Sequence, residues 1–204
     1  RLDDQLLDRL LTKCSEHLSI FAAPVVLDRD YDISPDACDM VIDVVRQNVP
    51  YVAVDLPHSW SPWSKRVLLQ ADEVIITAVP DLANLRNAKN IVDLLKTSRK
   101  NDGKPHLVLN MTGVPKRQEI TLKEFEQALD IKAICVIEND SESFSQAANN
   151  GQMIEEMNPK AKAAERFREI AMAMTHRKDT KADKKQQSAV SALAPLLEKL
   201  KFKR

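Results

Sequence analysis

Short apolar runs alternate with longer amphipathic stretches along the first 176 residues of the chain. The apolar runs are rich in β-branched residues and are apolar at both sets of alternating positions. This pattern is typical of parallel strands covered by helices on both faces, and not of an antiparallel sheet with one face in water. The predicted strands are residues 17–23, 51–56, 73–79, 106–110 and 133–137.

The stretches between these runs carry apolar residues three or four positions apart, which is the spacing of one helix face. Asp81 directly precedes one such stretch and is expected to be the N-cap of its helix. Gly151 follows an asparagine pair and is expected to end another helix. The alternation of strands and helices predicts an α/β fold, with a mostly parallel sheet and helices on both of its faces. The predicted helices are residues 2–12, 35–48, 82–98 and 160–176.

The composition fits one such domain followed by a tail. The chain has 204 residues, of which 44% are hydrophobic, enough for a substantial core. Its 30 basic and 30 acidic residues cancel, so general binding of nucleic acid is not expected. No apolar run approaches the ~20 residues that span a bilayer, and no signal-peptide pattern begins the chain. We therefore expect a cytoplasmic protein.

The charge is unevenly distributed along the chain. Residues 177–204 contain nine basic and three acidic residues, a net charge of +6, so residues 1–176 carry −6. Residues 177–187 are polar and predict a linker, whereas residues 188–204 regain helical spacing and end in basic residues. This basic amphipathic helix has two interpretations. It is an anchor on a membrane surface or a partner, or it is a frayed tail whose cations favour a helix C-terminus.

Polar residues follow the predicted strands, at the sheet edge where ligands bind in parallel α/β folds. Asp55 ends the second strand, and an aspartate there can hold Mg²⁺, directly or through water, beside a phosphate. Asn110 ends the fourth strand, and its amide offers both a donor and an acceptor, which suits the edge of an adenine. Each residue also fits a plain turn or cap, which is the commoner use of both residue types.

Glycine is scarce in this sequence. Its three glycines, Gly103, Gly113 and Gly151, are too far apart to form a glycine-rich phosphate-binding motif. The first residue is Arg1 and not methionine. We expect that an N-terminal phosphate-binding segment is missing from the chain.

Several segments resemble one known family. Residues 54–96, which begin VDLPHSWSPW, resemble the CpaE-type pilus assembly proteins of the MinD/ParA class of P-loop ATPases. The resemblance also includes residues 15–33, LVLNMTGVPKRQEI (107–120) and residues 147–167, which begin AANNGQM. It covers residues 1–176, which are expected to be a MinD/ParA-like ATPase domain without its phosphate loop. The AANNGQ motif points most narrowly to the CpaE group.

The resemblance implies an ATP-dependent switch that uses Mg²⁺, in which two nucleotides hold a homodimer together. By position, Asp55 matches the aspartate near Mg²⁺, so the resemblance makes it the catalytic and metal-site residue. Asn110 matches the asparagine that reads adenine. The other nucleotide-binding residues that the resemblance implies are Pro80, Asp81, Arg86, Ile137, Asn139 and Asp140.

The implied role is the assembly and localisation of Flp/tad type IV pili at the cytoplasmic face of the inner membrane. The partners would be the pilus machinery, and residues 188–204 would contact the membrane surface. Two alternatives remain open. One is a scaffold with a degenerate nucleotide site that does not hydrolyse ATP. The other is a MinD/ParA ATPase that positions the division site or the chromosome.

Overall fold

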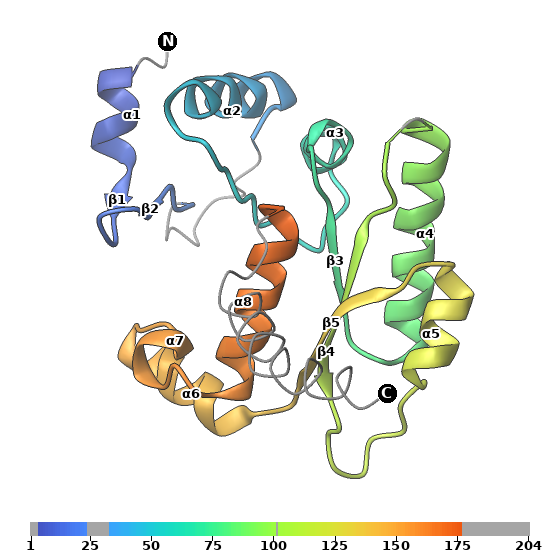
Figure 1. The fold of residues 1–204 in the computed structure, drawn as a ribbon. Helices are drawn as coiled ribbons and strands as arrows, with labels where there is room; N and C mark the ends of the chain where they lie inside the picture. The colour runs from blue at the N-terminus through green and yellow to red at the C-terminus, as the bar shows by residue number, and fades with distance from the viewer. Residues whose placement is uncertain (1–3, 24–32, 101, 177–204) are drawn as a thin grey trace, which may run out of the picture. The chain divides into compact units, whose positions relative to one another are not determined.

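The computed structural model describes residues 4–23, 33–100 and 102–176. The chain divides into two compact units, Arg1–Asp72 and Glu73–Arg204, whose elements are labelled in Figure 1. The predicted linker at 177–187 and the predicted basic helix at 188–204 lie outside the described residues. None of the helices in the described ranges combines the length and the apolar character that crossing a membrane requires.

The second unit is built on a parallel sheet. The strands are β3 (Ile75–Ala78), β4 (His106–Thr112) and β5 (Ala133–Glu138). Both pairings are parallel, and β4 lies between the other two strands. Leu107, Val108 and Leu109 of β4 are at most 2% exposed, which places the core of this unit around its central strand. These strands and their pairing confirm the predicted α/β fold.

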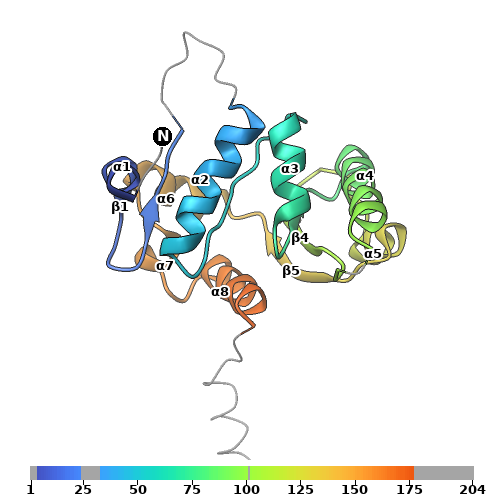
Figure 2. The ribbon, with the colours of Figure 1, turned by 90° about the horizontal axis from the view of Figure 1, so that it is seen from above.

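Helices cover both faces of this sheet. The helices of this unit are α4 (Leu82–Ser98), α5 (Leu122–Leu129), α6 (Ser141–Asn150), α7 (Ile154–Met157) and α8 (Lys162–Met174). Helices α4 and α5 lie on one side of the sheet and α8 lies on the other (Figure 2). On the α8 side, Ile170 packs against the buried residues Val108, Cys135 and Ile137. The central strand β4 is therefore buried between the two helical layers, as its apolar character on both faces predicts. The edge strand β3 is buried on one face only, because Ile75 and Thr77 are exposed.

Local capping residues define the ends of several helices. Asp81 accepts the backbone N–H of Asn84 at 2.8 Å and begins α4, as predicted. Thr121 and Glu124 form a capping box at the start of α5. Gly151 ends α6 in the left-handed conformation, with φ of 62°, also as predicted. These boundaries follow from residues within a few positions of each helix end.

The first unit differs more from the prediction. Its elements are α1 (Asp4–Leu10), β1 (Thr12–Lys13), β2 (Ser19–Ile20), α2 (Pro35–Asn48) and α3 (Pro62–Gln70). The predicted helices at 2–12 and 35–48 correspond to α1 and α2, and α3 is not among the predicted helices. Arg66 of α3 forms ion pairs with Asp36 and Asp39 of α2, at 3.0 and 2.7 Å, which join these two helices.

One predicted strand is wrong and another is only partly right. Residues 17–23 form only the short strand β2, which pairs antiparallel with β1, and residues 51–56 form no strand. Tyr51, Val52 and Val54 are 60%, 41% and 44% exposed. A strand depends on a neighbour that satisfies its backbone groups, and no strand within the described part of the first unit pairs with residues 51–56.

Two leucines of α5 that differ in burial test the packing of the second unit. Leu129 is 0% exposed, whereas Leu122 on the same helix is 42% exposed. We expect Leu129→Ala to lower the free energy of unfolding by about 2–5 kcal/mol, because it removes a buried side chain and leaves a cavity. The matched change Leu122→Ala should lower it by less than about 1 kcal/mol. Urea unfolding of the two variants measures both values, and equal losses would contradict the described burial.

Candidate functional site

The carboxyl ends of β3, β4 and β5 meet at one edge of the second unit. The backbone N–H of Ile120, in the connection after β4, donates to the carbonyl of Pro80 at 2.9 Å, just after β3. The backbone N–H of Asn139, after β5, donates to the carbonyl of Thr112 at 2.8 Å, at the end of β4. Because these bonds join neighbouring strand ends, the polar residues there form one candidate site.

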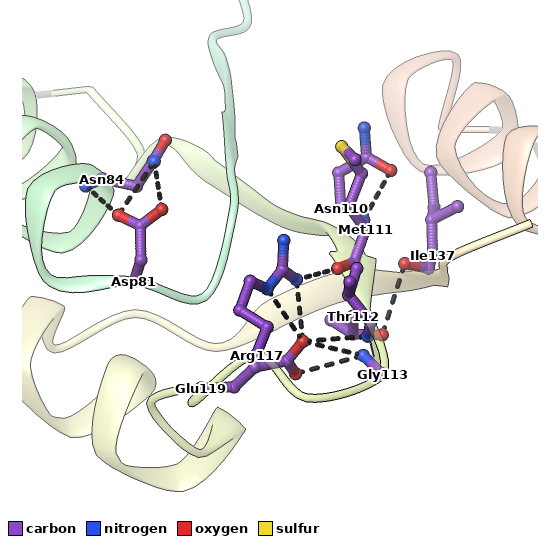
Figure 3. A network of polar contacts seen from close by, with 10 residues as sticks. Asp81, Asn84, Asn110, Met111, Thr112, Gly113, Arg117, Glu119 and Ile137 are labelled. Carbon is purple, nitrogen blue, oxygen red and sulfur yellow. Dashed lines mark hydrogen bonds and ion pairs between the residues drawn. The ribbon is translucent and has the colours of Figure 1, made fainter. Parts of the chain in front are cut away.

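Asn110 lies at a β-bulge near the end of β4. Leu109 pairs with Val136 and Thr112 pairs with Glu138, so β4 has one residue more than β5 between these two pairs. Met111 within the bulge has a positive φ of 54°. The side-chain oxygen of Asn110 accepts the backbone N–H of Met111 at 2.8 Å, and its amide nitrogen is turned away from that contact (Figure 3). Asn110 thus keeps its donor for a ligand.

A charged pair organises the turn that follows the bulge. The Glu119 carboxylate accepts the backbone N–H groups of Gly113 at 3.0 Å and Val114 at 3.2 Å. It also accepts Nη2 of Arg117 at 2.7 Å, and the same nitrogen donates to the carbonyl of Met111 (Figure 3). The Gly113 N–H and the Arg117 guanidinium lower the pKa of Glu119 below its ordinary value. The carboxylate is therefore charged at neutral pH.

The sequence prediction did not include Arg117 and Glu119. The only local signal for them is a basic and an acidic residue two positions apart, between Asn110 and the capping residue Thr121. Such a pair is common on solvated surfaces. Its role becomes evident only when the bulge brings the carbonyl of Met111 within reach of Arg117.

Asp81 and Pro80 occupy the turn between β3 and α4. Both carboxylate oxygens of Asp81 accept the side-chain amide of Asn84 at 3.0 Å, in addition to its backbone N–H. The backbone N–H of Asn84, followed by its side-chain amide, lowers the pKa of Asp81. Pro80 is buried, and Arg86 is exposed on α4. Asp81 is therefore a helix cap whose carboxylate already has donors around it.

The predicted residues after β4 and β5 divide into core and surface positions. Ile137 is 4% exposed and packs in the core with Val108 and Cys135, so it supports the strand end from inside. Asp140 is the N-cap of α6 and accepts the backbone N–H of Ser143 at 3.0 Å. Hydrogen bonds from Ser143 lower the pKa of Asp140. Asn139 is half-buried. Because it is neither a core residue like Ile137 nor a helix cap like Asp140, its polar side chain can contact a ligand.

The predicted magnesium ligand belongs to the other unit. Asp55 is exposed, in a stretch of the first unit without regular structure. Across the described residues, no group of three or more histidine, cysteine, aspartate or glutamate side chains could hold a metal ion. Mg²⁺ is commonly bound by one or two carboxylates together with substrate phosphates. A lone Asp55 fits that pattern only if a nucleotide supplies the phosphate ligands.

The capping role of Asp81 predicts a pH-dependent stability. Asp81→Ala should lower the free energy of unfolding by about 1 kcal/mol at pH 7, whereas Asp81→Asn should retain most of the cap. Because folding lowers the pKa of Asp81, its charge stabilises the fold above the unfolded pKa of about 4, and this contribution is lost as pH falls further. Urea unfolding at pH 7 and pH 3 should show the wild type losing stability relative to Asp81→Asn. An unchanged difference would show that the carboxylate does not cap α4.

The chain is similar in sequence and fold to known proteins. No protein-family model matches the chain. The chain is 27% identical over 142 residues to the septum site-determining protein MinD of Bacillus subtilis strain 168, which covers 68% of the chain and 52% of that protein. It is 27% identical over 151 residues to MinD of Escherichia coli strain K12, with 70% and 56% covered. The chain thus spans about half the length of the curated relatives it matches.

Solved structures share the fold. A ParA family ATPase from Chlorobium tepidum TLS superposes with a TM-score of 0.71 at 24% identity, covering 85% of the chain and 69% of that protein. The cell division ATPase MinD of Pyrococcus furiosus gives a TM-score of 0.60 at 19% identity, covering 70% and 59%. The α/β architecture with a parallel sheet is the one seen in these ATPases. Together with the sequence matches, it shows that this chain is homologous to the MinD/ParA superfamily of P-loop ATPases.

Proposed function

We propose that the chain forms the base-binding part of an ATP-dependent switch of the MinD/ParA type. The observation that carries this proposal is Asn110 at the carboxyl end of the central strand. Its oxygen is held by the bulge, and within the described residues its amide nitrogen has no hydrogen-bond acceptor. Ligands of parallel α/β folds bind at this edge. Asn110 would donate its amide N–H to the edge of an adenine and accept from it with the second lone pair of its oxygen, and Asn139 lies on the neighbouring strand end.

The other predicted residues have supporting parts in this proposal. Asp81 caps α4 after Pro80, and Arg86 on this helix would extend toward the nucleotide and the dimer partner. Ile137 packs in the core and Asp140 caps α6, and both would support the loop against which the base and ribose pack. Asp55 would bind Mg²⁺, through water, beside the phosphates. The 204 residues contain no glycine-rich loop, so contacts to the phosphates are not assigned to this chain.

The switch would operate through two states of the protein. ATP with Mg²⁺ would stabilise a homodimer of the complete gene product, and slow hydrolysis would return it to the monomer. Because the two states differ in their affinity for a partner or a membrane surface, the nucleotide would decide where the protein is bound. Residues 188–204, with their basic end, would supply the contact with the inner membrane from its cytoplasmic side.

The cellular role that we propose is the assembly and localisation of Flp/tad type IV pili, with the pilus machinery as partner. The AANNGQ motif at 147–152 supports this role, because it resembles the CpaE group more narrowly than MinD/ParA proteins in general. In the structure this segment forms the end of α6 and its Gly151 cap.

A second candidate is a cell-division positioning ATPase. The matched relatives from Bacillus subtilis and Escherichia coli are septum site-determining proteins, which favours this candidate. A third is a scaffold that binds pilus components without hydrolysing ATP. The use of Asp81 and Asp140 as helix caps favours the scaffold, because neither carboxylate is left for a metal.

Nucleotide binding tests the site directly. The complete gene product is titrated with a fluorescent ATP analogue in the presence and in the absence of Mg²⁺. We expect Asn110→Ala to weaken binding about tenfold, the effect of losing roughly 1.4 kcal/mol of hydrogen bonding to the base. Asp55→Ala should weaken binding only when Mg²⁺ is present. Asn90→Ala, an exposed position on α4, is the matched control and should bind as the wild type does. Wild-type affinity in both Asn110→Ala and Asp55→Ala would refute the site.

The cellular role is tested by deleting the gene. The pilus proposal predicts that surface pili disappear while division septa stay at their normal positions, as seen by electron microscopy and membrane staining. Misplaced septa with normal pili would support the division candidate instead. Restoration of pili by the Asn110→Ala variant would favour the scaffold.

A further inference from the structure

We propose that Arg117 and Glu119 are positioning residues for Asn110, which hold the β4 bulge in the conformation that presents the Asn110 amide to a nucleotide base. This inference rests on the proposed function, because it gives these two residues a part in base recognition. Neither residue touches the base itself in this proposal. Both act through the backbone of Met111 and Gly113.

The conformation that needs support is that of Met111. Its φ of 54° lies in the left-handed region, which disfavours any residue with a Cβ atom. Packing does not hold it there, because Met111 is 44% exposed. Its backbone N–H donates to Asn110 and its carbonyl accepts from Arg117 (Figure 3). The N–H of Met111 is therefore held by Asn110, which would read the base. The carbonyl of Met111 is held by Arg117, the positioning residue.

Glu119 in turn holds Arg117 and the turn beyond the bulge. Its carboxylate accepts Nε and Nη2 of Arg117, at 3.2 and 2.7 Å. It also accepts the backbone N–H of Gly113 with both oxygens, at 3.0 and 3.1 Å. Gly113 has a φ of 76°, so the chain reverses at this point. One carboxylate thus connects the guanidinium, the turn and, through Arg117, the bulge.

The residue that follows Glu119 is bonded to the turn after the neighbouring strand β3. The residue after Glu119 is Ile120, whose backbone N–H donates to the carbonyl of Pro80. The bulge is thereby braced against the turn after β3, which is the other polar turn of the site. Because a positive charge on Arg117 also lowers the pKa of Asp81, the two turns are coupled electrostatically as well.

The contacts lie at the surface of the unit and outside its core. The side chains of Arg117 and Glu119 are 26% and 22% exposed, and the buried apolar residues nearest in the chain lie in β4 and α5. Loss of the pair should therefore disturb the bulge while the sheet and helices stay folded. Hydrogen bonds from Gly113 and Arg117 keep Glu119 ionised, so the brace is intact at neutral pH.

The binding experiment separates base recognition from phosphate recognition. Wild type, Glu119→Gln and Asn110→Ala of the complete gene product are titrated with ATP and with inorganic tripolyphosphate. We expect Glu119→Gln to weaken ATP binding about threefold to fivefold, less than the about tenfold effect of Asn110→Ala because the hydrogen bond to the base is weakened and not lost, and to leave tripolyphosphate binding unchanged. Glu124→Gln makes the same change in the capping box of α5 and should leave both affinities at the wild-type value.

Arg117→Lys gives an intermediate test. A lysine ammonium can reach Glu119 or the carbonyl of Met111, but it lacks the planar fork that contacts both. We expect its ATP affinity to fall between those of the wild type and Glu119→Gln. A fall in tripolyphosphate affinity that matches the fall in ATP affinity, in either variant, would mean general damage to the protein and would overturn the inference.

The outcomes distinguish this inference from the proposed function. If Asn110→Ala loses ATP affinity while Glu119→Gln binds ATP as the wild type does, the function stands and the positioning role is overturned. If the wild type binds ATP no more tightly than tripolyphosphate and Asn110→Ala has no effect, both are overturned.

NMR spectra of the free protein test the positioning of Asn110 without any ligand. In ¹H–¹⁵N NMR spectra of the 204-residue chain, the amide proton of Gly113 should move with the ionisation of Glu119 as the pH is lowered. In Glu119→Gln this titration should vanish, and the side-chain amide signals of Asn110 should shift while core amides in β4 stay in place. Unshifted Asn110 signals in this variant would overturn the inference.

Discussion

The parallel pairing of β3, β4 and β5 is the constraint on which the candidate site depends. In a parallel sheet all strands end at the same edge, so residues from three distant parts of the sequence become neighbours. The pairing is possible because α4, α5 and α8 cover both faces of the sheet and keep Leu107, Val108 and Leu109 buried. Without that burial the polar residues after each strand would remain separate turns.

Polar residues at this edge serve two different purposes. Asp81 and Asp140 satisfy the N-termini of α4 and α6, and their carboxylates are occupied by backbone N–H groups. Asn110 is different, because the bulge uses its oxygen and leaves its amide nitrogen available. This difference in hydrogen bonding, more than residue type or position, distinguishes the proposed base-reading residue from the helix caps around it. Because Asp81 and Asp140 serve as helix caps, neither carboxylate is left for a metal, which favours the scaffold candidate.

Local signals in the sequence were sufficient for much of the second unit. The start of α4 at Asp81 and the end of α6 at Gly151 follow from caps that lie beside the helices they define. The predicted strand at 51–56 is wrong, and the one at 17–23 is reduced to β2, because the extent of a strand depends on a neighbour that the sequence pattern does not specify. The brace formed by Arg117 and Glu119 was missed for a similar reason. It depends on the register shift between β4 and β5, which is a property of the paired strands and not of either segment alone.

We propose that Asn110 reads the base of a bound adenine nucleotide. The most direct measurement is a crystal structure of the complete gene product with Mg²⁺ and a non-hydrolysable ATP analogue. We expect the Asn110 amide to lie within hydrogen-bonding distance of the adenine edge, with the Met111 bulge and its contact to Arg117 retained. A base bound away from the carboxyl end of β4, with Asn110 facing solvent, would contradict it.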